Sequence, residues 1–152
     1  MTTFDVRRVL DPIISHGKAL GRLDVVTGHE PKSAPRGKLS AAVWVQSTDP
    51  VTSSGLNSSS FRIVVQARIY ASLPSEPPGG IDPEMTAAAI EWVARLNGDL
   101  DLGGAARTID VRAIHGVGLG AQAGYIEQDG RLFRVYTLTI PVLVNDVWTE
   151  SA

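Results

Sequence analysis

FRIVVQARIYA, the segment from Phe61 to Ala71, alternates its side chains with the two-residue period of a β-strand. One face carries Phe61, Ile63, Val65, Ala67 and Ile69, and the other carries Arg62, Val64, Gln66, Arg68 and Tyr70. We therefore predict a strand whose first face lies in the core and whose second face looks toward water or a partner.

Two long loops flank the strand predicted just before this segment, which covers 39–47 (LSAAVWVQS). The first loop, 27–38, holds prolines, glycines and charges, and the second, 48–60, is rich in serine and almost uncharged. Structureless loops of about a dozen residues are uncommon in compact domains and either serve a function or are disordered. Because a low-charge Ser/Gly/Asn loop can become ordered on a partner, we interpret the second loop as a docking element, with simple floppiness as the alternative.

A first helix is predicted over 4–20, where apolar residues recur near helical spacing. Thr2 or Thr3 would cap this helix. Pro12 either kinks it or starts a second segment, because a proline in a helix interior removes a hydrogen bond and clashes with the preceding turn.

A second helix follows the breaker cluster PSEPPGG and ends near Asn97. We expect Asp82 to cap it and Pro83 to take the first helical position. Its predicted buried stripe consists of Met85, Ala88, Ala89, Trp92, Val93 and Leu96.

The C-terminal half is predicted to be mostly strand. A third alternating strand covers 107–115 (RTIDVRAIH), and a glycine-rich loop covers 116–124 (GVGLGAQAG). Two further strands, 125–128 and 131–144, flank Asp129-Gly130, a two-residue linker typical of a type I′ hairpin. Pro141 would place the far end of the last strand at a sheet edge or a bulge.

This order of elements predicts the fold class α+β. We expect a mainly antiparallel sheet of about five strands with two main helices packed on it. With 152 residues, 43% of them hydrophobic, the chain is predicted to form a single domain over 1–152.

The composition excludes several classes of site. Without cysteine there are no disulfides, thiolate zinc sites or cysteine nucleophiles, and a formal net charge of −2 provides no basic field for phosphate backbones. The start, MTTFDVRRVL, carries charges where a secretory signal has an apolar stretch, and no run approaches the roughly 18 apolar residues of a membrane span. We expect a soluble protein made in a cytoplasm, with no membrane and no sequence-specific nucleic acid among its partners.

The sequence lacks the motifs that carry chemistry. The GVGLG stretch, 116–120, has neither the GxGxxG spacing of a dinucleotide site nor the GxxxxGK[ST] pattern of a P-loop. His16, His29 and His115 share no HxxxH or HExxH spacing, and there is no GxSxG serine elbow. NGDLDLGG lacks the later glutamate of a calcium loop, so its aspartates are interpreted as turn residues. We expect no catalytic residue, no cofactor and no metal.

Small basic groups are the only concentrations of charge, and we interpret them as solvated surface. The alternative is that they face an acidic patch on a neighbouring subunit, which would orient docking. The groups are Arg7, Arg8, Lys18 and Arg22, and separately Lys32, Arg36 and Lys38.

Three stretches together resemble a known family. They are DPIISHGKALGRLDVVTGHEPKSAP (11–35), SSGLNSSSFRIVVQARIY (53–70) and AGYIEQDGRLFRVYTLTIPVLVNDVW (123–148). They are similar to the tail terminator, or tail completion, proteins of long-tailed phages (siphoviruses) that infect actinobacteria. The resemblance implies a structural virion protein with a mainly antiparallel sheet, helices packed against it, and no catalytic residues.

The resemblance also implies partners and a location. Terminators of this type form a homohexameric ring on the last ring of tail-tube subunits, stop tube growth, and present a surface to the head-completion proteins of the neck. The protein would lie in the virion at the head-proximal end of the tail after assembly in the host cytoplasm, and phage DNA would pass through the ring lumen. The matching GHEPKSAP and SSGLNSSS segments and the adjoining basic residues supply the candidate contacts: His29, Glu30, Pro31, Lys32, Arg36, Lys38, Ser53, Ser54, Leu56, Asn57, Ser58 and Ser59.

Two other interpretations stay open at this point. One is another neck or connector protein, or a tail-tube subunit. The other is an enzyme for a small ligand that uses 116–120 with His115 nearby, which would need a concave pocket and a convergent titratable group.

Overall fold

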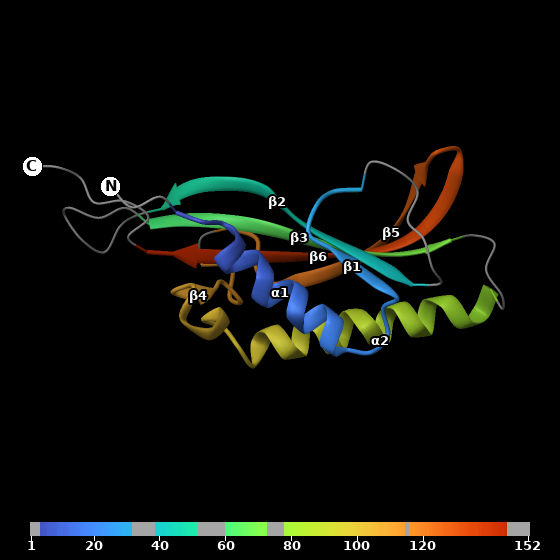
Figure 1. The fold of residues 1–152 in the computed structure, drawn as a ribbon, viewed down its shortest axis with the longest axis horizontal. Coiled ribbons are helices and arrows are strands. Elements are labelled where there is room, and N and C mark those ends of the chain that lie inside the picture. The colour runs from blue at the N-terminus through green and yellow to red at the C-terminus, as the bar shows by residue number, and fades with distance from the viewer. Residues whose placement is uncertain (1–3, 32–38, 52–59, 73–77, 115, 146–152) are drawn as a thin grey trace, which may run out of the picture.

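The computed structural model describes residues 4–31, 39–51, 60–72, 78–114 and 116–145. Two helices lie beneath one face of a long, curved, six-stranded sheet, which is the predicted α+β architecture (Figure 1). The elements in chain order are α1 (Arg7–Ala19), β1 (Val25–Thr27), β2 (Ser40–Val51), β3 (Ser60–Ser72), α2 (Pro78–Asn97), the 3₁₀ turn η1 (Leu102–Gly104), β4 (Thr108–Ile109), β5 (Gly120–Gln128) and β6 (Arg131–Val144).

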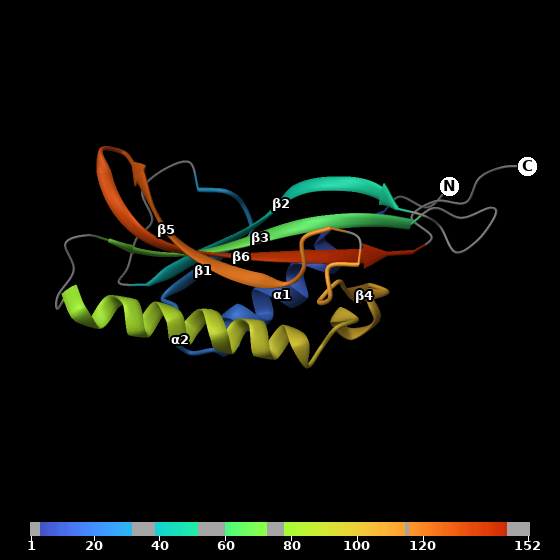
Figure 2. The same ribbon diagram turned by 180° about the vertical axis from the view of Figure 1, so that it is seen from behind.

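The sheet has the strand order β1-β2-β3-β6-β4. β5 pairs with β6 on the same side as β4, along the earlier residues of β6, whereas β4 pairs with its last residues. All pairs are antiparallel except β1 with β2, which run parallel over three residues. β3, the strand predicted from its alternation, lies between β2 and β6 along its whole length. Seen from behind, β5 and β6 form a hairpin that curls away from the helices (Figure 2).

The core lies between the helices and the predicted inner face of β3. Ile63, Val65, Ala67 and Ile69 are all buried there, together with most of the predicted stripe of α2. Of that stripe only Val93 is half-buried rather than fully buried. The alternation and the helical spacing therefore identified the correct faces.

The contact between the two helices depends on Gly17. The indole of Trp92 is fully buried against α1, and its Nε1 donates a hydrogen bond to the Ile13 carbonyl at 3.1 Å. A Cβ atom on Gly17 would lie 2.6 Å from Trp92 Cζ2, which is closer than non-bonded atoms approach. The glycine is therefore what lets the ring pack closely against α1.

The starts of both helices differ from the prediction. Pro12 lies inside one continuous helix, so it does not begin a second segment. Thr2 and Thr3 lie outside the described residues, and the Asp5 carboxylate accepts the free N–H of Arg7 at 3.1 Å. α2 starts at Pro78, so Asp82 is not its cap. The proline in the first helical position is Pro78, five residues before the predicted Pro83.

Strand boundaries around β2 also differ. β2 continues to Val51, so the first residues of the expected loop 48–60 are strand, while Val25–Thr27 of β1 overlaps the start of the other expected loop. A bulge between Val45 and Ser47 explains the error. One extra residue shifts the alternation by one position, which hides the continuation of a strand from a two-residue pattern.

The predicted strand 107–115 is wrong beyond its first residues. Only Thr108–Ile109 pairs with β6, and the chain then turns, with Ala113 at a φ of +59°. The predicted glycine-rich loop 116–124 is half wrong, because β5 begins at Gly120 and is paired with β6 throughout. The small residues of β5 carry little periodicity of their own, and its strand structure comes from its partner.

The hairpin prediction is confirmed. Gln128 pairs with Arg131, and Asp129 and Gly130 have φ of +53° and +71°, the signs that a type I′ turn requires. Pro141 lies neither at a sheet edge nor at a bulge, but where β6 changes its outer partner from β5 to β4. Its carbonyl accepts the Asp110 N–H at 2.8 Å. In an antiparallel strand the backbone N and O of one residue point to the same side. The Pro141 nitrogen therefore points to the outer side of β6, between its pairing with β5 and its pairing with β4, so no hydrogen bond between strands is lost.

Candidate interaction site

On the sheet face opposite the helices, buried apolar side chains cover the end that lies toward the β5–β6 hairpin turn. Tyr70 and Phe133 pack edge to face there, with ring centroids 6.3 Å apart, in a second apolar cluster that includes Ala42 and Val135. Burial raises the pKa of the Tyr70 hydroxyl above its ordinary value. The second face of β3, predicted to look toward water or a partner, is therefore only partly open.

The middle of the same face is polar and internally bonded. The Arg68 guanidinium carbon lies 5.5 Å from the Trp44 ring centroid, and its Nε donates to Thr137 Oγ1 at 3.0 Å. Gln66 Nε2 donates to Gln46 Oε1 at 2.8 Å. These bonds connect β2, β3 and β6, so the strip is a fixed polar surface and not a set of mobile charges.

The predicted contact residues are only partly described. His29 and Glu30 are exposed and Pro31 is half-buried, and Gln128 Nε2 donates to the Pro31 carbonyl at 3.1 Å. This bond places the start of the predicted contact segment beside the β5–β6 turn. The other candidates lie outside the described residues: Lys32, Arg36, Lys38, Ser53, Ser54, Leu56, Asn57, Ser58 and Ser59.

The segment between β4 and β5 is a surface loop whose second part, 116–119, was predicted as a loop, while its first part was wrongly included in the predicted strand 107–115. Buried polar groups hold it at both ends. Asp110 Oδ1 accepts the Ile114 N–H at 2.9 Å, and Arg62 Nη2 donates to the Val117 carbonyl at 2.6 Å. The loop is thus anchored from the sheet and from its own first residue.

This loop exposes its apolar side chains. Ile114 is 73% exposed and Val117 67%. Holding them there is unfavourable for the chain by itself: Ala113 has a positive φ, and the Nε of Arg62, a residue only 9% exposed, is buried with no hydrogen-bond partner. Gly118 has no room for a side chain, since a Cβ would lie 2.7 Å from the Val111 carbonyl oxygen.

An apolar groove of about 540 Å³ runs between α2 and the start of β5. Ile90, which is 63% exposed, forms its rim on the helix side. The rest of the lining comes from Thr86, Ala89, Val93, Ala94, Asn97, Val111, Leu119, Gly120, Ala121 and Tyr136. These residues include no carboxylate, lysine, arginine or histidine, and Tyr136 is their one titratable side chain, so the groove offers a mainly apolar contact surface.

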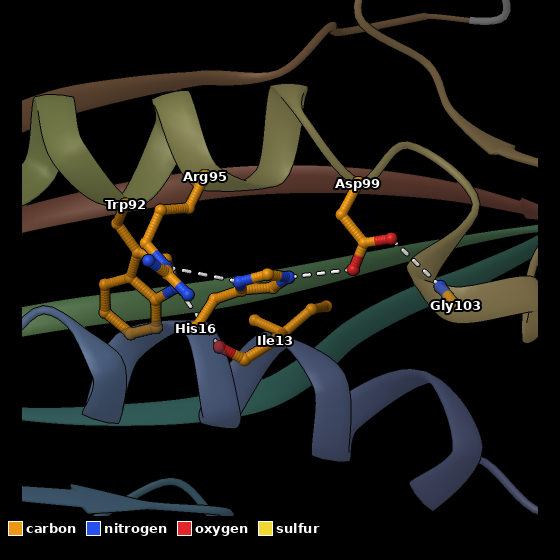
Figure 3. Close-up of polar contacts among 6 residues, drawn as sticks. All are labelled: Ile13, His16, Trp92, Arg95, Asp99 and Gly103. Carbon is orange, nitrogen blue, oxygen red and sulfur yellow. Dashed lines mark hydrogen bonds and ion pairs between the residues drawn. The ribbon is translucent and has the colours of Figure 1, made fainter.

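His16 takes part in a polar cluster beneath the sheet (Figure 3). Its Nε2 lies 2.8 Å from Asp99 Oδ2, while Arg95 Nε donates to its Nδ1 at 3.3 Å. The other Asp99 oxygen accepts the Gly103 N–H at 3.0 Å. The hydrogen bond from His16 is the main cause of an Asp99 pKa below its ordinary value.

This cluster joins helices and does not resemble a catalytic dyad. Because Arg95 Nε can only donate, Nδ1 of His16 accepts and Nε2 carries the proton given to Asp99. Both ring nitrogens are thereby occupied, and neither is free to accept a proton from a nucleophile. Asp99 is a turn residue as predicted, but its bond to a histidine 83 residues away could not be found from local spacing.

The described part of the chain contains no group of three or more His, Asp or Glu side chains arranged to hold a metal ion. Within the same residues, no helix has the length and apolar character needed to cross a membrane. Gly116 and Gly118 lie in the surface loop, and Gly120 opens a strand and not a helix. The stretch therefore lacks the backbone setting of a phosphate-binding loop.

Comparison with known proteins gives matches among solved structures only. No protein-family model and no curated protein matches the chain. Among solved structures, it is similar to a chain of the sheath/tube terminator of PVC, an extracellular contractile injection system, determined by cryo-EM in the extended state. The two are 13% identical with a TM-score of 0.36, over 96% of this chain and 59% of that chain. At that TM-score the match carries no argument about fold or function.

Proposed function

We propose that this protein is a structural subunit that ends a phage-type tail tube. It assembles with further copies of itself into a ring, expected to be a hexamer, on the last ring of tube subunits. The ring stops tube polymerisation and provides the surface on which the head is joined. The resemblance of 11–35, 53–70 and 123–148 to tail terminators of actinobacterial siphoviruses supports this role.

The open sides of the sheet are the structural observation that carries the proposal. β1 covers three of the twelve residues of β2, which leaves the outer edge of nine residues without a strand partner among the described residues. On the opposite side, β5 pairs only with β6, so its outer edge is open as well. A subunit with two different open sides is suited to repeated side-by-side association.

Ring formation and capping follow from the geometry of such contacts. A head-to-tail contact that closes by rotation gives a ring, whereas one that does not close gives a filament. A cap needs one face complementary to the tube end and another that rejects further tube subunits. The helical layer on one face and the polar, partly closed sheet on the other give the subunit two unlike faces (Figure 1).

The contact loops belong to this proposal. We assign docking on the tube, the neighbour or the neck proteins to the residues around His29–Lys38 and Ser53–Ser59, with 1–152 acting as one domain. The position of Pro31, which accepts a hydrogen bond from Gln128 beside the hairpin turn, supports the first group.

Electron microscopy tests the proposed function directly. The purified protein is imaged by negative stain alone and after mixing with tail-tube subunits that are polymerising. Closed rings, or soluble subunits that stop tubes at a capped end, are the expected results. Long tubes formed by this protein alone would make it a tube subunit, and tubes that grow unaffected by it would overturn the capping role.

A further inference from the structure

One row of residues crosses the sheet from Asp49 on β2 to Thr108 on β4, and two exposed arginines lie near its β4 end. Asp49 on β2 is opposite Arg62 on β3, Arg62 is opposite Leu143 on β6, and Leu143 is opposite Thr108 on β4. Three steps between neighbouring strands separate the two ends of this row by roughly 14 Å. The acidic end is a side of the sheet that β1 does not reach, and the other end is the outermost strand.

The side chains at these ends are exposed and have no ionic partner. Asp49 lies at the acidic end, and Arg107, next to Thr108, lies at the basic end with Arg112 in the loop that follows. Among the described residues none of the three takes part in a salt bridge, in contrast to Arg7 with Asp5 and Arg22 with Glu91.

We propose that these two sides meet between copies of the chain, so that the β2 side of one subunit docks against the β4 side of the next. The inference rests on the proposed function and names the surface through which that assembly forms. Asp49 of one copy then faces Arg107 and Arg112 of its neighbour. Complementary charge at opposite sides orients such a contact and suppresses wrong pairings.

Charge placement also decides the symmetry. A two-fold contact made by either of these sides alone would put Asp49 against Asp49, or the arginines against each other. Like charges disfavour both arrangements. A head-to-tail contact between the β2 side and the β4 side brings unlike charges together, and it gives a ring when the rotation between subunits closes.

The loop between β4 and β5 provides the apolar part of this surface. Ile114 and Val117 stand out from it on the same segment as Arg112, and the bonds from Asp110 and Arg62 keep them there. On the other side Pro50, next to Asp49, is exposed. An apolar contact among charges supplies the affinity that exposed ion pairs lack.

The contact is formed mainly by side chains and not by a sheet continuing from one copy to the next. On the β4 side the Ile109 N–H is already bonded to the Leu100 carbonyl at 2.7 Å. On the β2 side the bulge at 45–47 and Pro50 interrupt the edge. Both features are ones that prevent strand addition.

Charge reversal tests the proposal with matched controls. Association is measured by sedimentation velocity in low and high salt, and tube capping by microscopy, for Asp49→Arg and for Arg107→Asp with Arg112→Asp. Each reversal is expected to weaken association in low salt by about tenfold or more. Combining all three changes restores the opposite signs and should recover it. Asp11→Arg and Lys18→Asp each reverse a single charge on the exposed face of α1 and should have little effect.

Cross-linking provides a second readout that does not depend on charge. The chain has no cysteine, so Asp49→Cys combined with Arg107→Cys introduces the only pair. The two positions are too far apart within one copy to form a disulfide. Oxidation should therefore give a ladder of linked subunits, while either change alone gives nothing larger than a dimer.

The outcomes separate this contact from the proposed function. Wild-type rings or capping together with unaffected reversals and no ladder would overturn the contact and leave the terminator role standing. A wild-type protein that neither associates nor stops tubes would overturn both. Weaker association after each charge reversal, together with recovered association in the combined variant, would establish the contact.

Discussion

Gly17 shows how much of the helical layer depends on one missing methyl group. Replacing it with alanine removes a residue that weakens helices by about 1 kcal/mol, but it forces a Cβ to within 2.6 Å of a buried indole ring. Overpacking of this kind costs about 1–3 kcal/mol. We expect Gly17→Ala to lower the free energy of unfolding by up to about 2 kcal/mol, measured by urea denaturation.

A double-mutant cycle identifies the cause of that loss. The atoms that the new Cβ would meet belong to the six-membered part of the Trp92 indole. Trp92→Phe shortens the side chain, so Gly17→Ala should be much less destabilising in that background. An equal loss in both backgrounds would place the effect in the helix backbone and not in this contact.

Asp99 gives the fold an acid-sensitive bond. Its pKa is below the ordinary value of 3.8, first because of the hydrogen bond from His16 and also because of the Gly103 N–H. A lowered folded-state pKa contributes stability that is present above the unfolded value and is lost as the pH falls through the folded-state value. The loss should therefore begin as the pH falls below about 3.8.

Thermal melts between about pH 2.5 and 7 check this sign. Asp99→Asn should have a lower Tm than the wild type near neutral pH, and the gap should close in acid, where the wild-type carboxylate is protonated. Glu127→Gln, a neutralisation on the exposed part of β5, serves as the control. A gap that stays constant with pH would show that Asp99 acts through packing and not through its charge.

Neither of these residue contacts could be predicted from the sequence. His16 was judged only by its spacing to other histidines, and Asp99 only by its local loop, while 83 residues separate the two. The stripe of α2 was predicted correctly and contains Trp92. A buried stripe does not tell which residues pack against it, so it does not reveal that Gly17 must be small. Periodicity identifies a buried face but not what packs against it.

At the scale of elements, the β5–β6 turn requires glycine at one position. Gly130 has a φ of +71°, where a Cβ costs about 1–2 kcal/mol. Gly130→Ala should destabilise the protein by about 1 kcal/mol and Gly130→Asn by less, measured by chemical denaturation.

Gly124 in β5 is the matched control for the turn. It does not have a positive φ, and an added Cβ would only touch Val135 at an ordinary 3.8 Å. Gly124→Ala should therefore be close to neutral. A comparable loss at both positions would indicate a general sensitivity of the hairpin to added side chains.

Elements were predictable where the pattern belonged to the segment itself. β3 alternates because one of its faces meets the helices, and the Asp129-Gly130 pair determines its own turn. β5 was half missed because Gly120–Gly124 holds small residues whose pairing is set by β6. The loop after β4 was missed for the opposite reason: its sequence alternates, but Asp110 and Arg62 bond it as a turn.

At the scale of the whole molecule, the serine-rich segment after β2 can be separated from folding. The strand continues to Val51, opposite Ser60, so a shortened loop should begin after Val51. Deleting 53–58 is expected to leave the Tm nearly unchanged, since β2 and β3 stay paired up to Val51 and Ser60. If the segment docks on the tube or a neighbour, the same deletion abolishes capping, and normal tail length with the shortened protein would remove that role.

The α+β class and the helical layer followed from the order of predicted elements. The strand order did not, since β1 pairs in parallel and β4 and β5 share one side of β6. Such choices depend on which strands meet in space, and no local pattern records them. The two open sides of the sheet, on which the proposed assembly rests, are for this reason visible only in the structure.

The central position of β3 affects when the protein becomes competent to assemble. Its first half pairs with the last residues of β6, as Phe61 does with Val144. During synthesis β2 is therefore available to pair with β3 long before β6 is. The apolar face of β3 is not fully packed until the remainder of the chain has emerged. Contacts of such long sequence separation form late and leave partly made chains prone to aggregation. A subunit built this way can assemble with other chains only after translation has passed Val144, so truncated chains are excluded from any assembly.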